Sequence, residues 1–129
     1  MDDAPRVIIV EDESIVALDI RTRLNRMGYH ILGVVDSGEA AVVLTLAARP
    51  DIVLMDIRLK GDLDGIEAAK RIRQKSSVPI IYLTASADLH TVRRAEQEAP
   101  APFLLKPFDI QELRALIEKA LASPAQQNP

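Results

Sequence analysis

The most constraining stretch of the chain is Ile52–Met55, which runs directly into Asp56. Four consecutive apolar residues without polar alternation predict a strand buried on both faces of a parallel sheet. Asp56 then lies at the carboxyl end of that strand, where open α/β sheets bind their ligands. From this stretch alone, a carboxylate that only caps the next turn is an equally good interpretation.

Composition narrows the class of protein. The 129 residues are 48% apolar but only 3% aromatic, so the core has to consist of Val, Ile, Leu and Ala, which suits a parallel sheet covered by helices. A net charge of −3 argues against electrostatic capture of nucleic acid or an anionic membrane. Cysteine is absent, which excludes disulfides and thiolate chemistry. With no bilayer-length apolar run, we expect a soluble, cytoplasmic protein.

Apolar runs and helical periodicity alternate along the chain. The runs predict five strands, at 6–10, 31–35, 52–56, 79–83 and 103–105. Between and after the strands we expect five helices. The first covers 14–27, the second runs from an N-cap at Ser37 to before Pro50, and the third runs from a capping box at Asp64 and Glu67 through Ile72. The fourth lies within 87–99, and the fifth follows Asp109. We therefore expect one domain at 1–122, followed by a disordered tail or linker stub at 123–129.

This alternation predicts a doubly wound α/β fold with a five-stranded parallel sheet. Right-handed crossovers and the spacing of the units favour the strand order 2-1-3-4-5. In that order the first and third strands are neighbours. Their carboxyl ends carry Glu11, Asp12 and Asp56.

Polar side chains follow four of the predicted strands at this same edge. Three neighbouring carboxylates repel one another, and a hard divalent cation such as Mg2+ relieves that repulsion. The alternative is that Glu11 and Asp12 form a solvated acidic turn, which is the more common structure for an acidic pair. Lys106 is either a structural partner of Asp56 or a clamp for an incoming anion, and Thr84 either caps a helix or donates a hydrogen bond to a ligand. Together these groups suggest phosphoryl transfer with Asp56 as the nucleophile.

At this point the sequence resembles a known family, the receiver domain of two-component response regulators, of the chemotaxis-regulator type and with a flavodoxin-like fold. Five short motifs carry the resemblance in the correct order and cover nearly the whole chain. They are Val10–Asp12, Leu54–Asp56, Asp64–Gly65, Leu83–Ala85 and Leu105–Phe108.

The resemblance implies that Asp56 accepts a phosphoryl group from a histidine kinase or a phosphotransfer protein. It implies that Glu11, Asp12, Asp56 and the backbone carbonyl of Arg58 hold Mg2+. Lys106 matches the lysine that pairs with the phosphoryl group. Self-catalysed phosphorylation and slow dephosphorylation are the expected chemistry, rather than turnover of a separate substrate.

The resemblance also implies a conformational switch. Thr84 matches the hydroxyl that moves toward the phosphoryl group, and Phe103 matches the aromatic side chain that turns inward behind it. The bond between Lys106 and Pro107 is expected to be cis. The output surface is expected on the fourth helix, the fifth strand and the fifth helix, which is also where a homodimer is expected to form.

Three other functions remain to be weighed. The main alternative is an interaction module on the same fold that signals without phosphorylation. A magnesium-dependent phosphohydrolase is disfavoured because Arg58 stands where such enzymes place a second aspartate, and a flavin carrier is disfavoured by the acidic first loop.

We expect His30 and His90 to lie on the surface, and Arg93 and Arg94 to lie on a solvated helix face. The chain is expected to be either a stand-alone receiver or part of a larger regulator.

Overall fold

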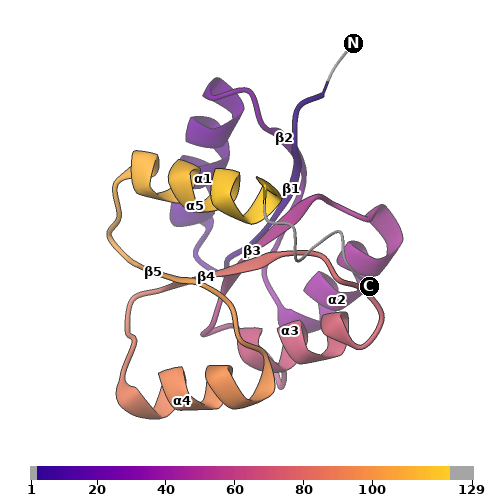
Figure 1. Ribbon diagram of the computed structural model, residues 1–129, viewed down its shortest axis with the longest axis vertical. Coiled ribbons are helices and arrows are strands. Elements are labelled where there is room, and N and C mark those ends of the chain that lie inside the picture. Colours follow the sequence, from indigo (N-terminus) through magenta and orange to yellow (C-terminus); the bar gives the residue numbers. More distant parts are fainter. Residues whose placement is uncertain (1–2, 123–129) are drawn as a thin grey trace.

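The computed structural model describes residues 3–122, in which five strands alternate with five helices (Figure 1). The strands are β1 (Arg6–Val10), β2 (His30–Val35), β3 (Ile52–Asp56), β4 (Ile80–Thr84) and β5 (Phe103–Leu105). The helices are α1 (Ser14–Arg26), α2 (Gly38–Ala48), α3 (Gly65–Arg73), α4 (Leu89–Glu98) and α5 (Ile110–Ala122). The predicted tail at 123–129 lies outside the described residues.

The sheet confirms the predicted topology. All neighbouring strands pair in parallel, in the order β2-β1-β3-β4-β5. Helices α1 and α5 cover one face, while α2, α3 and α4 cover the other (Figure 1). Each face has its own apolar cluster, with Leu24 and Ile117 in the first and Ile66 and Ala95 in the second.

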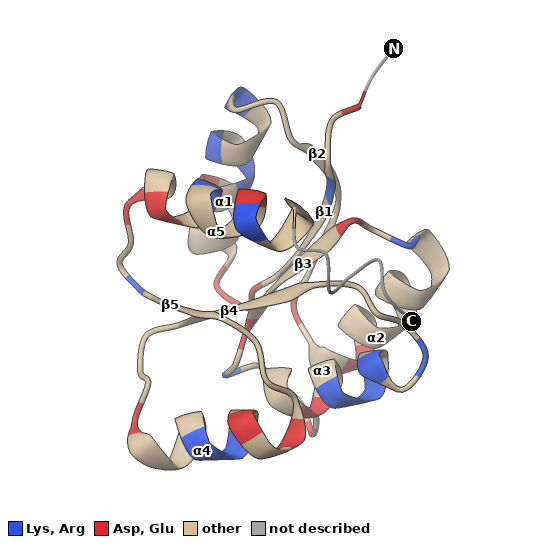
Figure 2. Cartoon of the chain, in the orientation of Figure 1, with Lys and Arg blue, Asp and Glu red and all other residues tan. Residues whose placement is uncertain are grey.

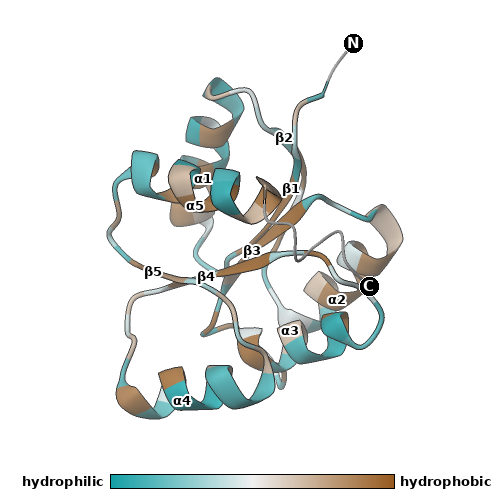
Figure 3. Cartoon of the chain, in the orientation of Figure 1, coloured by the Kyte–Doolittle hydropathy of each residue, from teal (hydrophilic) through white to brown (hydrophobic). Residues whose placement is uncertain are grey.

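The central strands are buried, as the uninterrupted apolar run Ile52–Met55 predicted for β3. Every residue of β3 and of β4 is buried. Figure 3 shows the sheet as the most hydrophobic layer of the molecule, and Figure 2 shows most of the charge on helices and loops. Among residues 3–122, no helix has both the length and the apolar character that crossing a membrane requires.

Side-chain caps explain where three of the helices begin. The Ser37 hydroxyl accepts a hydrogen bond from the Ala40 amide at 3.1 Å, and Asp64 accepts one from the Glu67 amide at 2.9 Å. At α4 the cap is Asp88, which accepts from the Thr91 amide at 2.9 Å. Each cap satisfies one of the amides that a helix leaves without an internal partner.

Gly65 brings the start of α3 directly against the end of β3. Its amide donates to the carbonyl of Ile57 at 2.8 Å, and a Cβ atom at this position would lie 2.1 Å from the backbone oxygen of Asp56. The atoms that this Cβ would meet, the Asp56 oxygen and the Ile57 Cα, belong to the backbone and cannot rotate away. Only glycine therefore fits here, and the carboxyl end of β3 is held in place by that contact.

We expect Gly65→Ala to destabilise the fold by about 3 kcal/mol, because the methyl group overpacks a rigid backbone contact. The matched control is Gly33→Ala, where the new Cβ would meet only the Leu44 Cδ2 atom, at 2.8 Å, at the movable end of a side chain. Urea denaturation of both variants measures the difference. Equal losses in the two variants would contradict this account of Gly65.

Candidate phosphoacceptor site

Three acids meet at the carboxyl edge of the sheet. Glu11 and Asp12 follow β1 and Asp56 ends β3, and one carboxylate oxygen from each lies within 4.8 Å of the other two. Glu11 and Asp56 are buried, whereas Asp12 is partly exposed. The adjacency of β1 and β3 brings these residues together, as the predicted strand order required.

Lys106 reaches the same cluster from the end of β5. Its ammonium donates to Glu11 Oε1 and, at 3.2 Å, to Asp56 Oδ2, and the lysine side chain is only 15% exposed. The Lys106 amide donates to the Thr84 carbonyl at 2.8 Å, which fixes the strand end from which the side chain leaves. The bond between Lys106 and Pro107 is cis, which confirms the expectation.

Burial sets the acid–base properties of this cluster. It raises the pKa of Asp56 to about 6; the neighbouring Glu11 carboxylate adds to the increase, and Lys106 opposes it. Burial alone favours a lower pKa for Lys106, but the hydrogen bond to Glu11 and the attraction of Asp56 outweigh it and hold that pKa above its ordinary value. The lysine thus stays charged, and Asp56 is mostly ionised at neutral pH.

The carboxylates differ in how many partners they already have. Glu11 accepts from Lys106 and from the Glu13 amide, at 3.2 Å. Asp56 accepts from Lys106 and from the Arg58 amide, at 3.3 Å. Asp12 accepts no hydrogen bond from any described residue. Three clustered carboxylates form a hard oxygen donor set, so the residues present fit a magnesium ion.

Thr84 is buried at the end of β4 with its hydroxyl engaged locally. The hydroxyl donates to the Ser86 carbonyl at 2.9 Å and accepts from the Ser86 amide at 3.2 Å. It does not cap α4, because Asp88 does so. The hydroxyl has to leave Ser86 before it can serve a ligand at Asp56.

Phe103 is partly buried and packs on a residue that sequence analysis did not single out. Its ring lies 5.2 Å from that of Tyr82, at an angle of 53°. The Tyr82 hydroxyl donates to the carbonyl of Ala99 at 2.7 Å, and burial raises the pKa of Tyr82 to about 12. Tyr82 therefore ties β4 to the end of α4, beside Phe103. In the sequence it is hidden within an apolar run, and no spacing signal marks it.

One expectation about α4 was wrong. Arg94 does not lie on a solvated face, because its guanidinium binds Asp64 at the start of α3. The two residues are thirty positions apart and meet only through the packing of α4 on α3. Arg93, His30 and His90 are exposed, as expected.

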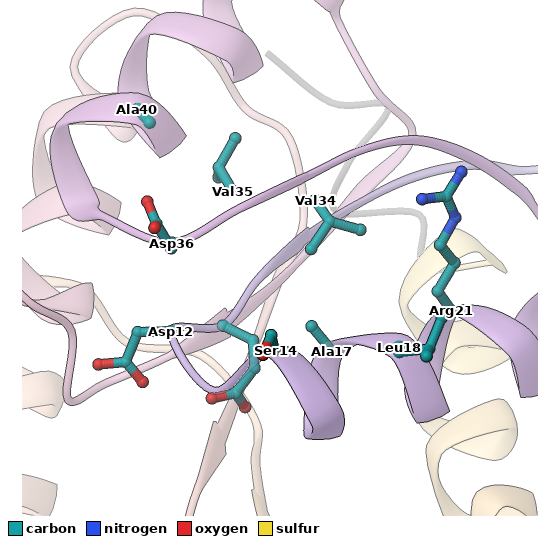
Figure 4. A pocket seen from close by; sticks show the side chains of 10 residues that line it. Asp12, Ser14, Ala17, Leu18, Arg21, Val34, Val35, Asp36 and Ala40 are labelled. Carbon is teal, nitrogen blue, oxygen red and sulfur yellow. The ribbon is translucent and has the colours of Figure 1, made fainter.

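Two hollows adjoin the acids. One, of about 310 Å3, opens over the site itself and is lined by Asp12, Asp56, Thr84 and Lys106, among others. The second, of about 450 Å3, extends from Glu11 and Asp12 between α1 and the start of α2, with Asp36 near Asp12 and Arg21 at its far end (Figure 4). The site is thus an open pocket at the surface, accessible to a group presented by another molecule.

A doubly wound sheet with three acids and a lysine at its switch point is the architecture of a receiver domain. The response regulator receiver domain family matches residues 7–118. The chain belongs to this family, and its fold and acidic pocket are those of a receiver domain of two-component response regulators.

Individual relatives agree with this assignment. The chain is 38% identical over 117 residues to the transcriptional regulatory protein PdtaR of Mycobacterium tuberculosis. The aligned region covers 91% of this chain and 57% of PdtaR. The chain therefore spans little more than half the length of that relative.

Two solved structures are also similar to the chain. The signal receiver domain of a modulated diguanylate cyclase from Desulfovibrio desulfuricans G20 superposes with a TM-score of 0.90 at 41% identity, covering 98% of this chain and 100% of that one. The receiver domain of the sensor histidine kinase PA1611 from Pseudomonas aeruginosa superposes with a TM-score of 0.85 at 32% identity, covering 93% and 99%; it holds a magnesium ion in its active-site cleft.

Proposed function

We propose that Asp56 accepts a phosphoryl group from a histidine kinase or a phosphotransfer protein, with Mg2+ bound by Glu11, Asp12, Asp56 and the backbone carbonyl of Arg58. The observation that carries this proposal is the convergence of three acids and one lysine on a single open pocket. The magnesium-bound cleft of the related PA1611 receiver supports the choice of metal.

The geometry suggests how this chain's residues take part. The Asp56 carboxylate is mostly ionised above pH 6, so one of its oxygens is available to attack phosphorus. A P–O bond to Asp56 forms as the P–N bond to the donor histidine breaks, and the imidazole leaves. Lys106 neutralises phosphoryl oxygens from its place beside Asp56, and the bound Mg2+ supplies further neutralising charge.

The resulting acyl phosphate biases a two-state element. Thr84 exchanges its hydrogen bond to Ser86 for one to the phosphoryl group, and Phe103 turns into the space that this movement leaves. The altered surface comprises α4, β5 and α5. It controls an output domain or a protein partner, and a homodimer forms through the same face. The resemblance to chemotaxis regulators and the domain boundary at residue 122 remain predictions.

Mg2+ is expected to raise the melting temperature of the wild-type protein at pH 7.5, because the ion offsets the repulsion among the three acids. Asp12→Asn should weaken the apparent Mg2+ affinity at least tenfold, since Asp12 is the one of the three acids to which no described residue donates a hydrogen bond. The matched control is Asp36→Asn, an exposed acid on the adjoining hollow. Differential scanning fluorimetry across a Mg2+ titration compares them, and equal affinities in the two variants would refute the metal assignment.

The second candidate function is signalling without phosphorylation, through contacts of the 87–108 surface. The large apolar side chain of Leu89, 64% exposed on α4, and that of Leu105, 52% exposed on β5, favour a protein contact there. Incubation with acetyl phosphate and Mg2+ distinguishes the two candidates. A gain of one phosphoryl group supports the first, and an unchanged mass supports the second.

A further inference from the structure

An ion cluster joins α4 to the start of α3. Arg94 binds both carboxylate oxygens of Asp64, with Nη1 at 2.5 Å from Oδ2 and Nη2 at 3.0 Å from Oδ1. Glu98 lies 3.4 Å from Arg94 Nε, and Glu67 lies 3.7 Å from Nη2. Two parallel hydrogen bonds between guanidinium and carboxylate fix orientation as well as distance. Figure 2 shows the basic band in the middle of α4, followed by acidic residues toward its end.

The pair is better protected from water than an ordinary surface ion pair. The side chains of Arg94 and Asp64 are 27% and 29% exposed, whereas the neighbouring Arg93 is exposed and has no ion-pair partner among the described residues. Burial favours a higher pKa for Asp64, but the hydrogen bonds from Arg94 and from the Glu67 amide outweigh it and hold that pKa below its ordinary value.

Asp64 connects this cluster to the phosphoacceptor. It is the N-cap of α3, and the next residue, Gly65, packs against the backbone of Asp56 and donates to Ile57. Arg94 therefore holds a segment that touches the end of β3.

Another connection between α4 and the site runs through the loop after β4. In that loop the Thr84 hydroxyl bonds to Ser86, and Asp88 caps α4 two residues later. Helix α4 is thus held near the site by Arg94 and by this loop, in addition to the hydrogen bond from the Tyr82 hydroxyl to Ala99 at its end. The loop is the attachment expected to move with Thr84, whereas the Arg94 attachment binds the body of the helix to α3.

We propose that Arg94 is a positioning residue that holds α4 in its resting place on α3 and thereby opposes the switch driven from Asp56. This inference rests on the proposed phosphorylation of Asp56. A displacement of α4 away from Asp64 would lengthen the bidentate contact, so the contact favours the resting arrangement. Its removal should shift the switch equilibrium toward the active arrangement by about two- to fivefold, within the range for an exposed ion pair.

The test compares Arg94→Ala with the matched control Arg93→Ala, which removes an equal charge from the preceding position on the same helix. Asp64→Asn is a third variant, because asparagine keeps the N-cap hydrogen bond to the Glu67 amide but loses the charge that Arg94 binds. Two quantities are measured with acetyl phosphate and Mg2+. The first is the rate of phosphoryl gain. The second is the NMR chemical shifts of the amides at 85–92, each expressed as a position between the shifts of the unphosphorylated and the phosphorylated wild-type protein.

We expect Arg94→Ala and Asp64→Asn to move these resonances toward the phosphorylated positions before any phosphorylation, and to accelerate phosphoryl gain about two- to fivefold. Arg93→Ala should match the wild type, and the double variant of Asp64 and Arg94 should exceed neither single variant. If Arg94 has a purely structural role, Arg94→Ala will lower the unfolding midpoint but give the same two readouts as Arg93→Ala. That result would overturn this inference but leave the proposed function intact. A wild-type protein that gains no phosphoryl group would overturn the proposed function as well.

Discussion

Asp56→Asn is expected to abolish phosphoryl gain completely and, at the same time, to stabilise the fold by about 2 kcal/mol at pH 7.5. The first effect follows because the amide is not a nucleophile toward phosphorus. The second follows because ionised Asp56 is buried next to Glu11. A change that removes function while increasing stability indicates that the residue serves chemistry rather than folding.

The sign of the stability effect depends on pH. The pKa of Asp56 is raised from 3.8 to about 6 in the folded protein, which corresponds to about 3 kcal/mol. The stability associated with this carboxyl group is fully present below pH 3.8 and is lost as the pH rises through about 6. Asparagine never ionises and avoids this loss, although it gives up the attraction of Lys106. The advantage of Asp56→Asn should therefore be present at pH 7.5 and absent at pH 4.

Urea denaturation at both pH values measures this effect, and intact-mass analysis after acetyl phosphate treatment measures phosphoryl gain. The matched control is Asp62→Asn, an exposed acid in the loop after β3, which should leave both quantities unchanged. A phosphorylated species in Asp56→Asn, or a variant less stable than the wild type at pH 7.5, would contradict the assignment.

Lys106→Ala is expected to have the opposite effect on stability. The substitution leaves Glu11 and Asp56 facing each other without their shared cation, so we expect a loss of about 3 kcal/mol at pH 7.5. The loss should shrink toward pH 5, where Asp56 takes up a proton. Mg2+ binding should remain largely intact because the metal-binding acids are still present.

The functional consequence of Lys106→Ala should be uncoupling. Asp56 should still acquire a phosphoryl group, more slowly, but the amides of the β4–α4 loop should not reach their phosphorylated NMR positions. Lys106→Met keeps the apolar stem and separates the loss of charge from the loss of packing. Lys75→Ala, an exposed lysine, is the control. Normal switching in the Lys106 variants would mean that this lysine is only structural.

The strand order and the location of the site could be predicted because both depend on short-range patterns. Uninterrupted apolar runs such as Ile52–Met55 specify buried parallel strands, and parallel strands deliver their carboxyl ends to one edge. The caps at Ser37 and Asp64 were likewise predictable, since each depends on residues three positions apart.

The partners of individual side chains could not be predicted. Arg94 and Asp64 form an ion pair only because α4 packs on α3, and Tyr82 reaches the carbonyl of Ala99 only because α4 ends above β4. The hydrogen bond of Lys106 to Glu11, in addition to Asp56, depends on how a long side chain crosses the pocket. Such contacts follow from tertiary packing and leave no periodicity in the sequence.

The most direct test of the central claim is to locate the phosphoryl group on the wild-type protein. After treatment with acetyl phosphate and Mg2+, borohydride reduction converts an acyl phosphate to an alcohol that peptide mapping can assign to one residue. We predict a single modified residue, Asp56, and loss of the modification when Mg2+ is chelated beforehand. Modification at another residue, or none with Mg2+ present, would contradict the proposed phosphoacceptor.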